Sequence, residues 1–223
     1  ANEAAAKAED GVAAALAGRD FMVSNYWDAG QERWLADNGI ALIRGSGKLA
    51  GTGIVEVDGA RYTAKHVVIA TGSDPIIPSV PGLRELEGIW TNSEATGMKA
   101  VPRRLLVLGA GAVGVELAQA VRRLGGEVVL VVNTKHVLPR EPRPLGEALT
   151  EVLHRDGIEL ALGVQAIGAR HAGGQYFLEL DDGRTLNGDR LLVATGRRPR
   201  VDAIGLETVG VEANSRGIKV DSR

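Results

Sequence analysis

The chain has 223 residues, of which 44% are hydrophobic and 24% charged, as in proteins that fold around an apolar core. The formal net charge of −2 argues against a nucleic-acid partner, and the apolar runs are too short to cross a membrane. The absence of cysteine excludes disulfides, thiolate metal ligands and a cysteine nucleophile, and the four histidines lack metal-ligand spacing. We therefore expect no metal site. Because no signal-peptide pattern opens the sequence, we expect a cytoplasmic protein.

Two helical patterns come first. Residues 1–19 are rich in alanine and predict a helix, whose composition fits either a natural helix or an engineered helical spacer. Residues 24–37 predict a second helix. Trp27 and Trp34 lie seven residues apart on one face of it, and we expect them to pack into a core.

The segment from residue 40 to 70 has the composition of β-strands. The expected strands are 40–43, 54–57, 61–63 and 67–70, the last of them buried. Asp58-Gly59 predicts a tight hairpin turn between the second and the third. Pro75, Pro78 and Pro81 exclude a helix after the last strand and indicate an extended segment.

The pattern after residue 103 is that of a nucleotide-binding fold. Residues 105–108 form a continuous apolar run, typical of a parallel strand buried on both faces. A glycine-rich loop follows, and then a helix that Gly125-Gly126 ends. The next expected elements are strand 128–132, helix 144–155, strand 158–160, hairpin 176–186 and strand 191–194. This order predicts an α/β fold with a Rossmann-like, doubly wound parallel sheet and a β-meander.

An internal repeat indicates a second, related domain. Residues 58–75 align without a gap to residues 182–199, and both copies run from an Asp-Gly turn through a strand to Ala-Thr-Gly and proline. The second copy has a glycine loop ahead of it, whereas the corresponding loop of the first copy would fall before residue 1. We therefore expect the first domain to be incomplete, in either a truncated chain or a natural subunit that dispenses with those parts.

Six residues form the loop between the strand and the helix: Gly109, Ala110, Gly111, Ala112, Val113 and Gly114. Gly109 allows the tight turn, Gly111 lets the backbone approach a pyrophosphate, and Gly114 lets the helix pack closely on the sheet. The helix N-terminus offers N–H groups and partial positive charge to the phosphates. The alternative is a tight turn without a ligand. The favoured interpretation is a site for NAD(P)H.

The end of the second strand carries the information on nucleotide choice. Asp or Glu there is typical of NAD-binding domains, but this chain has Val132, followed by Asn133. No carboxylate would repel a 2′-phosphate, and Lys135, His136 and Arg140 are candidates to contact one. This pattern favours NADPH slightly, with a solvated surface loop as the alternative.

Charged residues near the loop and after the last strand are further candidates. We expect Glu116 in the first helical turn, where a carboxylate either complements the helix dipole or lies near a nicotinamide. Arg197, Arg198 and Arg200 follow the last strand and either contact phosphate or an acidic partner or form a solvated loop. Thr71, Gly72, Thr195 and Gly196, which end the two repeated strands, complete the cofactor-binding candidates. No residue stands out as a catalytic acid, base or nucleophile.

At these motifs the chain resembles the pyridine nucleotide-disulfide oxidoreductases, the flavoprotein family of mercuric reductase and dihydrolipoamide dehydrogenase. The matching stretches are 69–75, 90–95, 109–118 and 192–199. The resemblance implies the NAD(P)H-binding portion of a flavin-dependent oxidoreductase, in which hydride passes from NAD(P)H to FAD. In relatives, a glutamate at the place of Glu116 lies near the nicotinamide and a gating tyrosine often stands at Ala112. NADPH-using relatives have arginine at the place of Asn133, which weakens the NADPH prediction.

The resemblance also implies a domain plan. Residues 1–80 and 200–223 correspond to a partial FAD-type domain, 81–102 to a linker, and 103–199 to the NAD(P)-binding domain. The FAD phosphate loop and the redox cysteine pair of the family have no counterpart in this sequence, so enzymatic turnover by this chain is left open. The alternatives are a non-catalytic dinucleotide-binding module or a truncated chain without turnover. Because an incomplete first domain would leave apolar surface over residues 40–72 uncovered, we expect either a homodimer or a flavin-domain partner.

Overall fold

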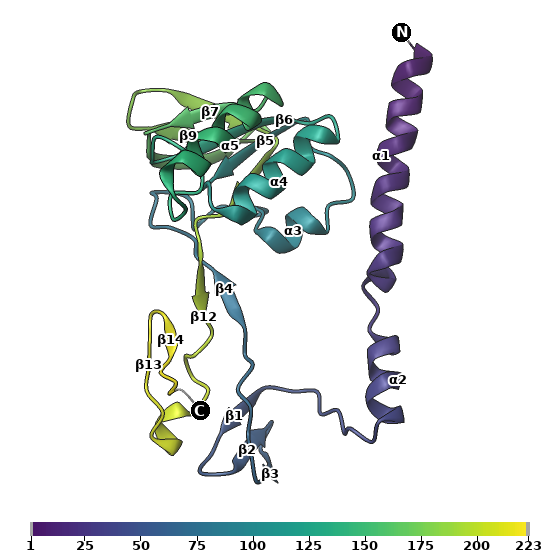
Figure 1. Ribbon diagram of the computed structural model, residues 1–223, viewed down its shortest axis with the longest axis vertical. Helices are drawn as coiled ribbons and strands as arrows, with labels where there is room; N and C mark the ends of the chain where they lie inside the picture. The colour runs from purple at the N-terminus through teal and green to yellow at the C-terminus, as the bar shows by residue number, and fades with distance from the viewer. Residues whose placement is uncertain (1, 222–223) are drawn as a thin grey trace. The chain divides into compact units, whose positions relative to one another are not determined.

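The computed structural model describes residues 2–221, with side chains from residue 10 onward. The chain divides into two compact units (Figure 1). The first consists of residues 1–74 and 198–223, and the second is the continuous stretch Pro75–Arg197. Residues 81–102, for which we expected a linker, thus belong to the second unit. Among the described residues, no helix combines the length and the hydropathy that a membrane span requires.

A four-stranded parallel sheet forms the centre of the second unit, in the order β11-β5-β6-β7. Its strands are β5 (Arg104–Leu108), β6 (Glu127–Val132), β7 (Glu159–Leu162) and β11 (Arg190–Val193). Helices α4 (Ala112–Arg123) and α5 (Arg143–Arg155) connect the first three strands. The predicted α/β class with a Rossmann-like parallel sheet is confirmed.

The central strands read as continuous apolar runs because both of their faces are covered. On one face, Leu106 and Val129 pack in a buried cluster with Tyr176 and Leu178 of the antiparallel meander. The meander consists of β8 (Ala166–Ala172), β9 (Gln175–Leu180) and β10 (Thr185–Gly188). On the other face, α4 packs on β5 and β6 and buries one side, including Val121. This double covering holds the carboxyl ends of the strands rigidly in place.

Residues 75–103, which include the segment 81–102, pack against this sheet. Leu83 is fully buried in the cluster beneath the meander, and the Tyr176 hydroxyl donates to the Glu87 carbonyl at 2.8 Å. Trp90 forms a parallel β-bridge with Leu192 of β11, and the short helix α3 (Asn92–Thr96) follows. As predicted, no helix forms over the proline-rich segment, but only Pro75 belongs to a strand, residues 81–85 form turns, and the burial of Leu83 ties the segment to the second unit.

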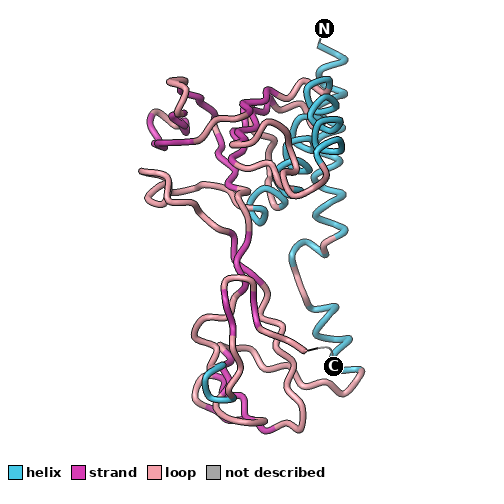
Figure 2. Tube along the Cα trace, turned by 60° about the vertical axis from the view of Figure 1, so that its left-hand side comes forward, coloured by secondary structure: helices cyan, strands magenta, loops and turns pink. Residues whose placement is uncertain are grey.

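Two paired strands carry the chain between the units. They are β4 (Ser73–Pro75) and β12 (Arg197–Pro199), seen side by side in Figure 2. Gly72 and Gly196, at the ends of the repeated strands, both accept backbone hydrogen bonds here, from Arg200 at 2.9 Å and from Ile76 at 3.0 Å. These two backbone hydrogen bonds lie at the two ends of the β4–β12 pair.

The described part of the first unit contains two α-helices, two short 3₁₀ helices (η1 and η2) and two small sheets. Its elements are α1 (Asn2–Met22), η1 (Ser24–Tyr26), α2 (Ala29–Asp37), β1 (Gly47–Leu49), β2 (Ile54–Val57), β3 (Ala60–Thr63), η2 (Leu206–Val209), β13 (Ala213–Asn214) and β14 (Gly217–Ile218). The predicted hairpin at Asp58-Gly59 is confirmed as the antiparallel pair β2-β3. The second helix begins at Ala29 and not at residue 24, and the core packing predicted for Trp27 and Trp34 is wrong, since they are 73% and 60% exposed.

Two predicted strands of the first unit are absent from the described structure. Residues 40–43 and 67–70 form neither helix nor strand, and Val68 is 88% exposed. The second copy of the repeat forms β11 because β5 offers it a parallel neighbour. Within the described residues of the first unit, the segment 67–70 has no such neighbour. An apolar sequence forms a strand only where another strand satisfies its backbone.

Candidate functional site

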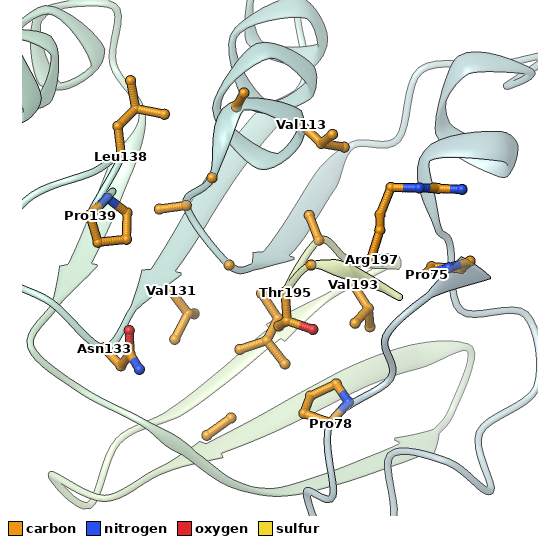
Figure 3. A pocket seen from close by; sticks show the side chains of 18 of the residues that line it. Pro75, Pro78, Val113, Val131, Asn133, Leu138, Pro139, Val193, Thr195 and Arg197 are labelled. Carbon is orange, nitrogen blue, oxygen red and sulfur yellow. The ribbon is translucent and has the colours of Figure 1, made fainter. Parts of the chain in front are cut away.

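A cavity of about 660 Å³ lies at the carboxyl ends of β5, β6 and β11, within the second unit (Figure 3). Ligands of open α/β sheets bind at this edge, and the volume suits a small-molecule ligand. The glycine loop contributes residues 109–113 to its wall. Figure 3 labels Asn133, Leu138 and Pro139 at one end, Pro75, Pro78 and Arg197 at the other, and Val131, Val193 and Thr195 between them.

Two of the three loop glycines are required by the fold itself. Gly109 has a φ of +107°, and a Cβ there would lie 2.5 Å from the Ala194 carbonyl oxygen. A Cβ at Gly114 would collide with the Gly109 carbonyl oxygen, because α4 packs directly on the turn. Any larger residue at either place would distort the junction of strand and helix.

Gly111 differs from both. Its φ of −72° is available to every amino acid, and a Cβ there would meet no atom within 4 Å. The protein's own packing therefore gives no reason for glycine at this place. It leaves a bare stretch of backbone facing open space at the start of a helix.

The N-terminus of α4 is free to bind an anion. Gly111 is the N-cap, and in this fully described helix no side chain caps it and the first turn holds no acidic residue. The Val115 N–H is bonded to the Gly111 carbonyl at 3.0 Å, whereas the preceding N–H groups have no carbonyl within the helix to bond. These groups and the helix dipole create a site of positive potential beside the cavity.

Backbone hydrogen bonds hold the glycine loop in place. The Gly109 N–H donates to the Val131 carbonyl at 3.1 Å, and the Ala110 carbonyl accepts from the Leu138 N–H at 2.8 Å. On the neighbouring strand end, the Thr195 hydroxyl donates to the Ile76 carbonyl at 2.8 Å. Such a loop is preorganised, so that a ligand would not need to order it.

The model of the pyridine nucleotide-disulphide oxidoreductase family matches residues 3–223. The chain belongs to this family. Among curated relatives, it is 37% identical over 196 residues to a dihydrolipoyl dehydrogenase of Thermus scotoductus, covering 85% of this chain and 42% of that protein. It is 40% identical over 173 residues to a mercuric reductase of Shewanella putrefaciens, covering 76% and 30%. The predicted resemblance is confirmed.

Solved structures agree. The HOCl-induced flavoprotein disulfide reductase RclA from Escherichia coli superposes with a TM-score of 0.84 at 26% identity, covering 94% of this chain and 48% of that one. LpdA from Mycobacterium tuberculosis gives 0.79 at 27% identity, with the same coverage. The chain spans less than half the length of these relatives. Members of this flavoprotein oxidoreductase family use FAD and NAD(P)H as cofactors.

The structure brings some of the predicted site residues to the cavity. Those that line it are Gly109, Ala110, Gly111, Ala112, Val113, Asn133, Arg140, Thr195, Gly196 and Arg197. Gly114 lies behind the loop, where it packs α4 on the turn. The first-turn location expected for Glu116 is wrong: α4 begins at Ala112, which puts this exposed residue in the second turn and off the cavity wall.

Other predicted residues do not line the cavity. Val132 is buried at 3% exposure, and Lys135 is exposed elsewhere on the loop. His136 Nδ1 lies 2.8 Å from the Val137 carbonyl oxygen, with its ring against Gly146 of α5. Thr71 and Gly72 belong to the first unit, where the Thr71 hydroxyl donates to the Arg200 carbonyl at 2.6 Å.

Several residues that line the cavity were not predicted from the sequence. They are Asn92, Leu138, Pro139, Glu141, Val164, Gln165 and Ala166, together with the prolines at 75 and 78 and Val80. Most come from irregular segments without periodicity, so no pattern marks them. The Asn92 carboxamide was detectable in principle, since Asn92 directly follows the N-cap Thr91 within the Thr91 to Glu94 capping box that starts α3. Its Oδ1 accepts a hydrogen bond from Arg197 at 2.6 Å.

The capping box gives that end of the cavity a fixed support. The Glu94 carboxylate accepts hydrogen bonds from the Thr91 hydroxyl and N–H, each at 2.7 Å. The bond from the Thr91 hydroxyl, followed by those from backbone N–H groups, lowers the pKa of Glu94 below its ordinary value. The ionised carboxylate thus holds the first turn of α3, from which Asn92 contacts Arg197.

The two cofactors of the family fit the described residues differently. The second unit offers a dinucleotide a glycine loop whose bare backbone at Gly111 faces the cavity. In the described part of the first unit, no strand leads through a glycine loop into a helix, so these residues do not form an FAD phosphate site. Nor does the described part of the chain hold a group of three acidic or histidine residues that could bind a metal ion.

Proposed function

We propose that the second unit binds NAD(P)H in this cavity and presents its nicotinamide to FAD in a flavin-dependent oxidoreductase. The observation that carries the proposal is Gly111, a glycine that the fold does not need, at an uncapped helix N-terminus on the cavity wall. A pyrophosphate needs close approach to backbone N–H groups, and that is what a bare residue allows.

Different parts of the cavity wall would contact different parts of the nucleotide. The N–H groups at the start of α4 would hold the pyrophosphate, and the strand end at Thr195 and Gly196 would support the nucleotide between its two halves. The apolar wall of Pro75, Pro78 and Val80 would exclude water from the nicotinamide. The reduced nicotinamide supplies the hydride. The transfer of the hydride requires no acid or base from the cavity wall. The chain's part is therefore to bind and orient the nucleotide.

We further propose a preference for NADPH over NADH. Arg140 and Asn133 line the end of the cavity next to β6, where the adenosine ribose of a Rossmann fold lies. The Arg140 guanidinium would pair with a 2′-phosphate. Lys135 and His136 do not contribute to the wall, which leaves Arg140 as the main cation there. Glu141 also lines this end and favours the opposite preference, through hydrogen bonds to ribose hydroxyls.

Titration of the chain with NADPH and with NADH, followed by nicotinamide fluorescence, tests both statements. We expect saturable binding of both nucleotides and a lower Kd for NADPH. The R140Q variant should raise the Kd for NADPH at least tenfold and leave that for NADH within a factor of two, since a hydrogen-bonded charge pair contributes about 1.5–3 kcal/mol. No binding of either nucleotide would refute the site, and tighter binding of NADH would refute the preference.

A non-catalytic dinucleotide-binding module is the second candidate, and the observation behind it is that the described residues of the first unit do not form an FAD phosphate site. The visible spectrum before and after addition of FAD and desalting separates the two. A retained flavin band supports the oxidoreductase role for this chain, whereas nucleotide binding without flavin supports the module.

Exposed apolar side chains such as Leu42, Ile43 and Val68 support a homodimer or a flavin-domain partner, which light scattering at several concentrations would test.

A further inference from the structure

The loop that carries Arg140 is clamped from two sides. We name residues 133–142, between β6 and α5, the Arg140 loop. The Val137 N–H donates to the Thr150 hydroxyl of α5 at 3.1 Å, and the neighbouring Leu138 N–H donates to the Ala110 carbonyl of the glycine loop at 2.8 Å. Two consecutive backbone groups are thus tied to different elements. The middle of the loop has little freedom to shift along the sheet edge.

Between these anchors the backbone is strained. Leu138 has a φ of +51°, a left-handed conformation that is unfavourable for a branched side chain and persists only where the surroundings enforce it. Leu138 and the next three residues line the cavity, Arg140 among them. If Leu138 relaxed to a negative φ, the chain direction would change just before Arg140. The conformation of Leu138 therefore decides where the guanidinium lies.

Thr150 is oriented to enforce this conformation. Its hydroxyl donates to the Gly146 carbonyl one helical turn earlier, at 2.7 Å, which turns a lone pair toward the Val137 N–H. Val137 is fully buried, so water does not replace that bond. Gly146 adds a steric limit, because a Cβ there would collide with the His136 ring and lie 2.5 Å from the Val137 carbonyl oxygen. The loop and the helix fit only with glycine at 146 and a hydroxyl at 150.

We propose that Thr150 is a positioning residue for nucleotide choice: by holding Val137, it keeps Leu138 strained and Arg140 at the 2′ end of the cavity. This inference rests on the proposed NAD(P)H site and on the role of Arg140 there. Thr150 itself does not line that cavity and would not touch the nucleotide. Its effect should therefore appear in the discrimination between NADPH and NADH and not in the affinity for both.

The test is the ratio of the Kd values for NADH and NADPH in the T150V variant, which keeps the side-chain shape and removes the hydroxyl. We expect the Kd for NADPH to rise about fivefold, as for one lost hydrogen bond, and that for NADH to change less than twofold. T150S, which keeps a hydroxyl, should retain the wild-type ratio of the two Kd values. T208V in the first unit is the matched control, since Thr208 also donates to a carbonyl, that of Gly205 at 2.7 Å, and should leave both Kd values unchanged.

A double variant shows whether Thr150 acts through Arg140. In the R140Q background, T150V should have no further effect on the ratio. If T150V does not fold, G146A is the second variant: it pushes the same loop from the helix side and should also lower the ratio. An unchanged ratio, or an equal rise of both Kd values, would overturn the inference. Failure of the unaltered chain to bind either nucleotide would refute the proposed function itself, and this inference with it.

Discussion

Replacing Gly111 by alanine should change the affinity for the nucleotide and leave the stability of the fold nearly unchanged. The backbone at 111 already has a φ open to alanine, and the added methyl group would meet no protein atom within 4 Å. Loss of chain entropy in the unfolded state favours alanine by about 0.4–1 kcal/mol. Alanine is a poorer N-cap than glycine by a similar amount. The free energy of unfolding should therefore change by less than about 0.5 kcal/mol, since these two effects oppose each other.

The affinity for NAD(P)H should fall strongly in the G111A variant. The methyl group would occupy the space through which a pyrophosphate reaches the N–H groups of α4. Loss of one hydrogen bond to a charged group costs about 1.5–3 kcal/mol, which raises the Kd for NAD(P)H tenfold to a hundredfold. Urea denaturation and nucleotide titration on the same preparation measure both quantities.

Two further glycine variants complete the experiment. G114A should lower the free energy of unfolding by about 1–3 kcal/mol or more, because its Cβ collides with the Gly109 carbonyl. G30A, in α2 of the first unit with open space around it, is the matched control and should leave the Kd unchanged. Wild-type affinity in a folded G111A variant would refute the assignment of the pyrophosphate to this loop.

Two predictions concern the stability of the second unit. L178A removes a fully buried side chain between the meander and the sheet and should lower the free energy of unfolding by about 3–5 kcal/mol in urea, whereas a loss below about 1 kcal/mol would contradict the packing described. E94Q removes the carboxylate of the α3 capping box. Because the pKa of Glu94 is lowered in the folded chain, its contribution is present above the ordinary value of 4.5 and is lost as pH falls through the folded pKa. The difference in stability between the chain and E94Q should thus be largest near neutral pH and vanish in acid; a difference that stays constant down to low pH would argue against the capping role.

The sequence predicts the second unit well because each of its signals is local. The strands at 105–108 and 128–132 are buried on both faces and leave continuous apolar runs, and the glycine loop stands between such a strand and a helix. The first unit shows the opposite case. Residues 67–70 have the same apolar composition as their repeat in β11, yet only the latter has β5 beside it. Strand formation depends on a neighbour that the segment's own residues do not reveal.

The residues of the candidate site also differ in how far the sequence alone predicts them. The glycine loop and the strand end at Thr195 and Gly196 were predictable from residue type and spacing. Which residues of the loop after β6 face the cavity was not, because that loop has no periodicity and its course depends on the left-handed conformation of Leu138. Lys135 and Arg140 look equally suitable in sequence, and only the fold distinguishes them.

The paired strands β4 and β12 have a consequence for how the chain assembles. The first unit joins segments from both sides of the second, for example through the hydrogen bond from the Leu49 N–H to the Ile204 carbonyl at 2.8 Å. In an unfolded chain, forming that bond means closing a very long loop, at an entropic cost that grows with loop length. Once residues 75–197 have folded, their two ends leave as neighbouring strands and most of that loop is already closed. The second unit then acts as the turn of one very large hairpin, and its early folding would speed the assembly of the rest.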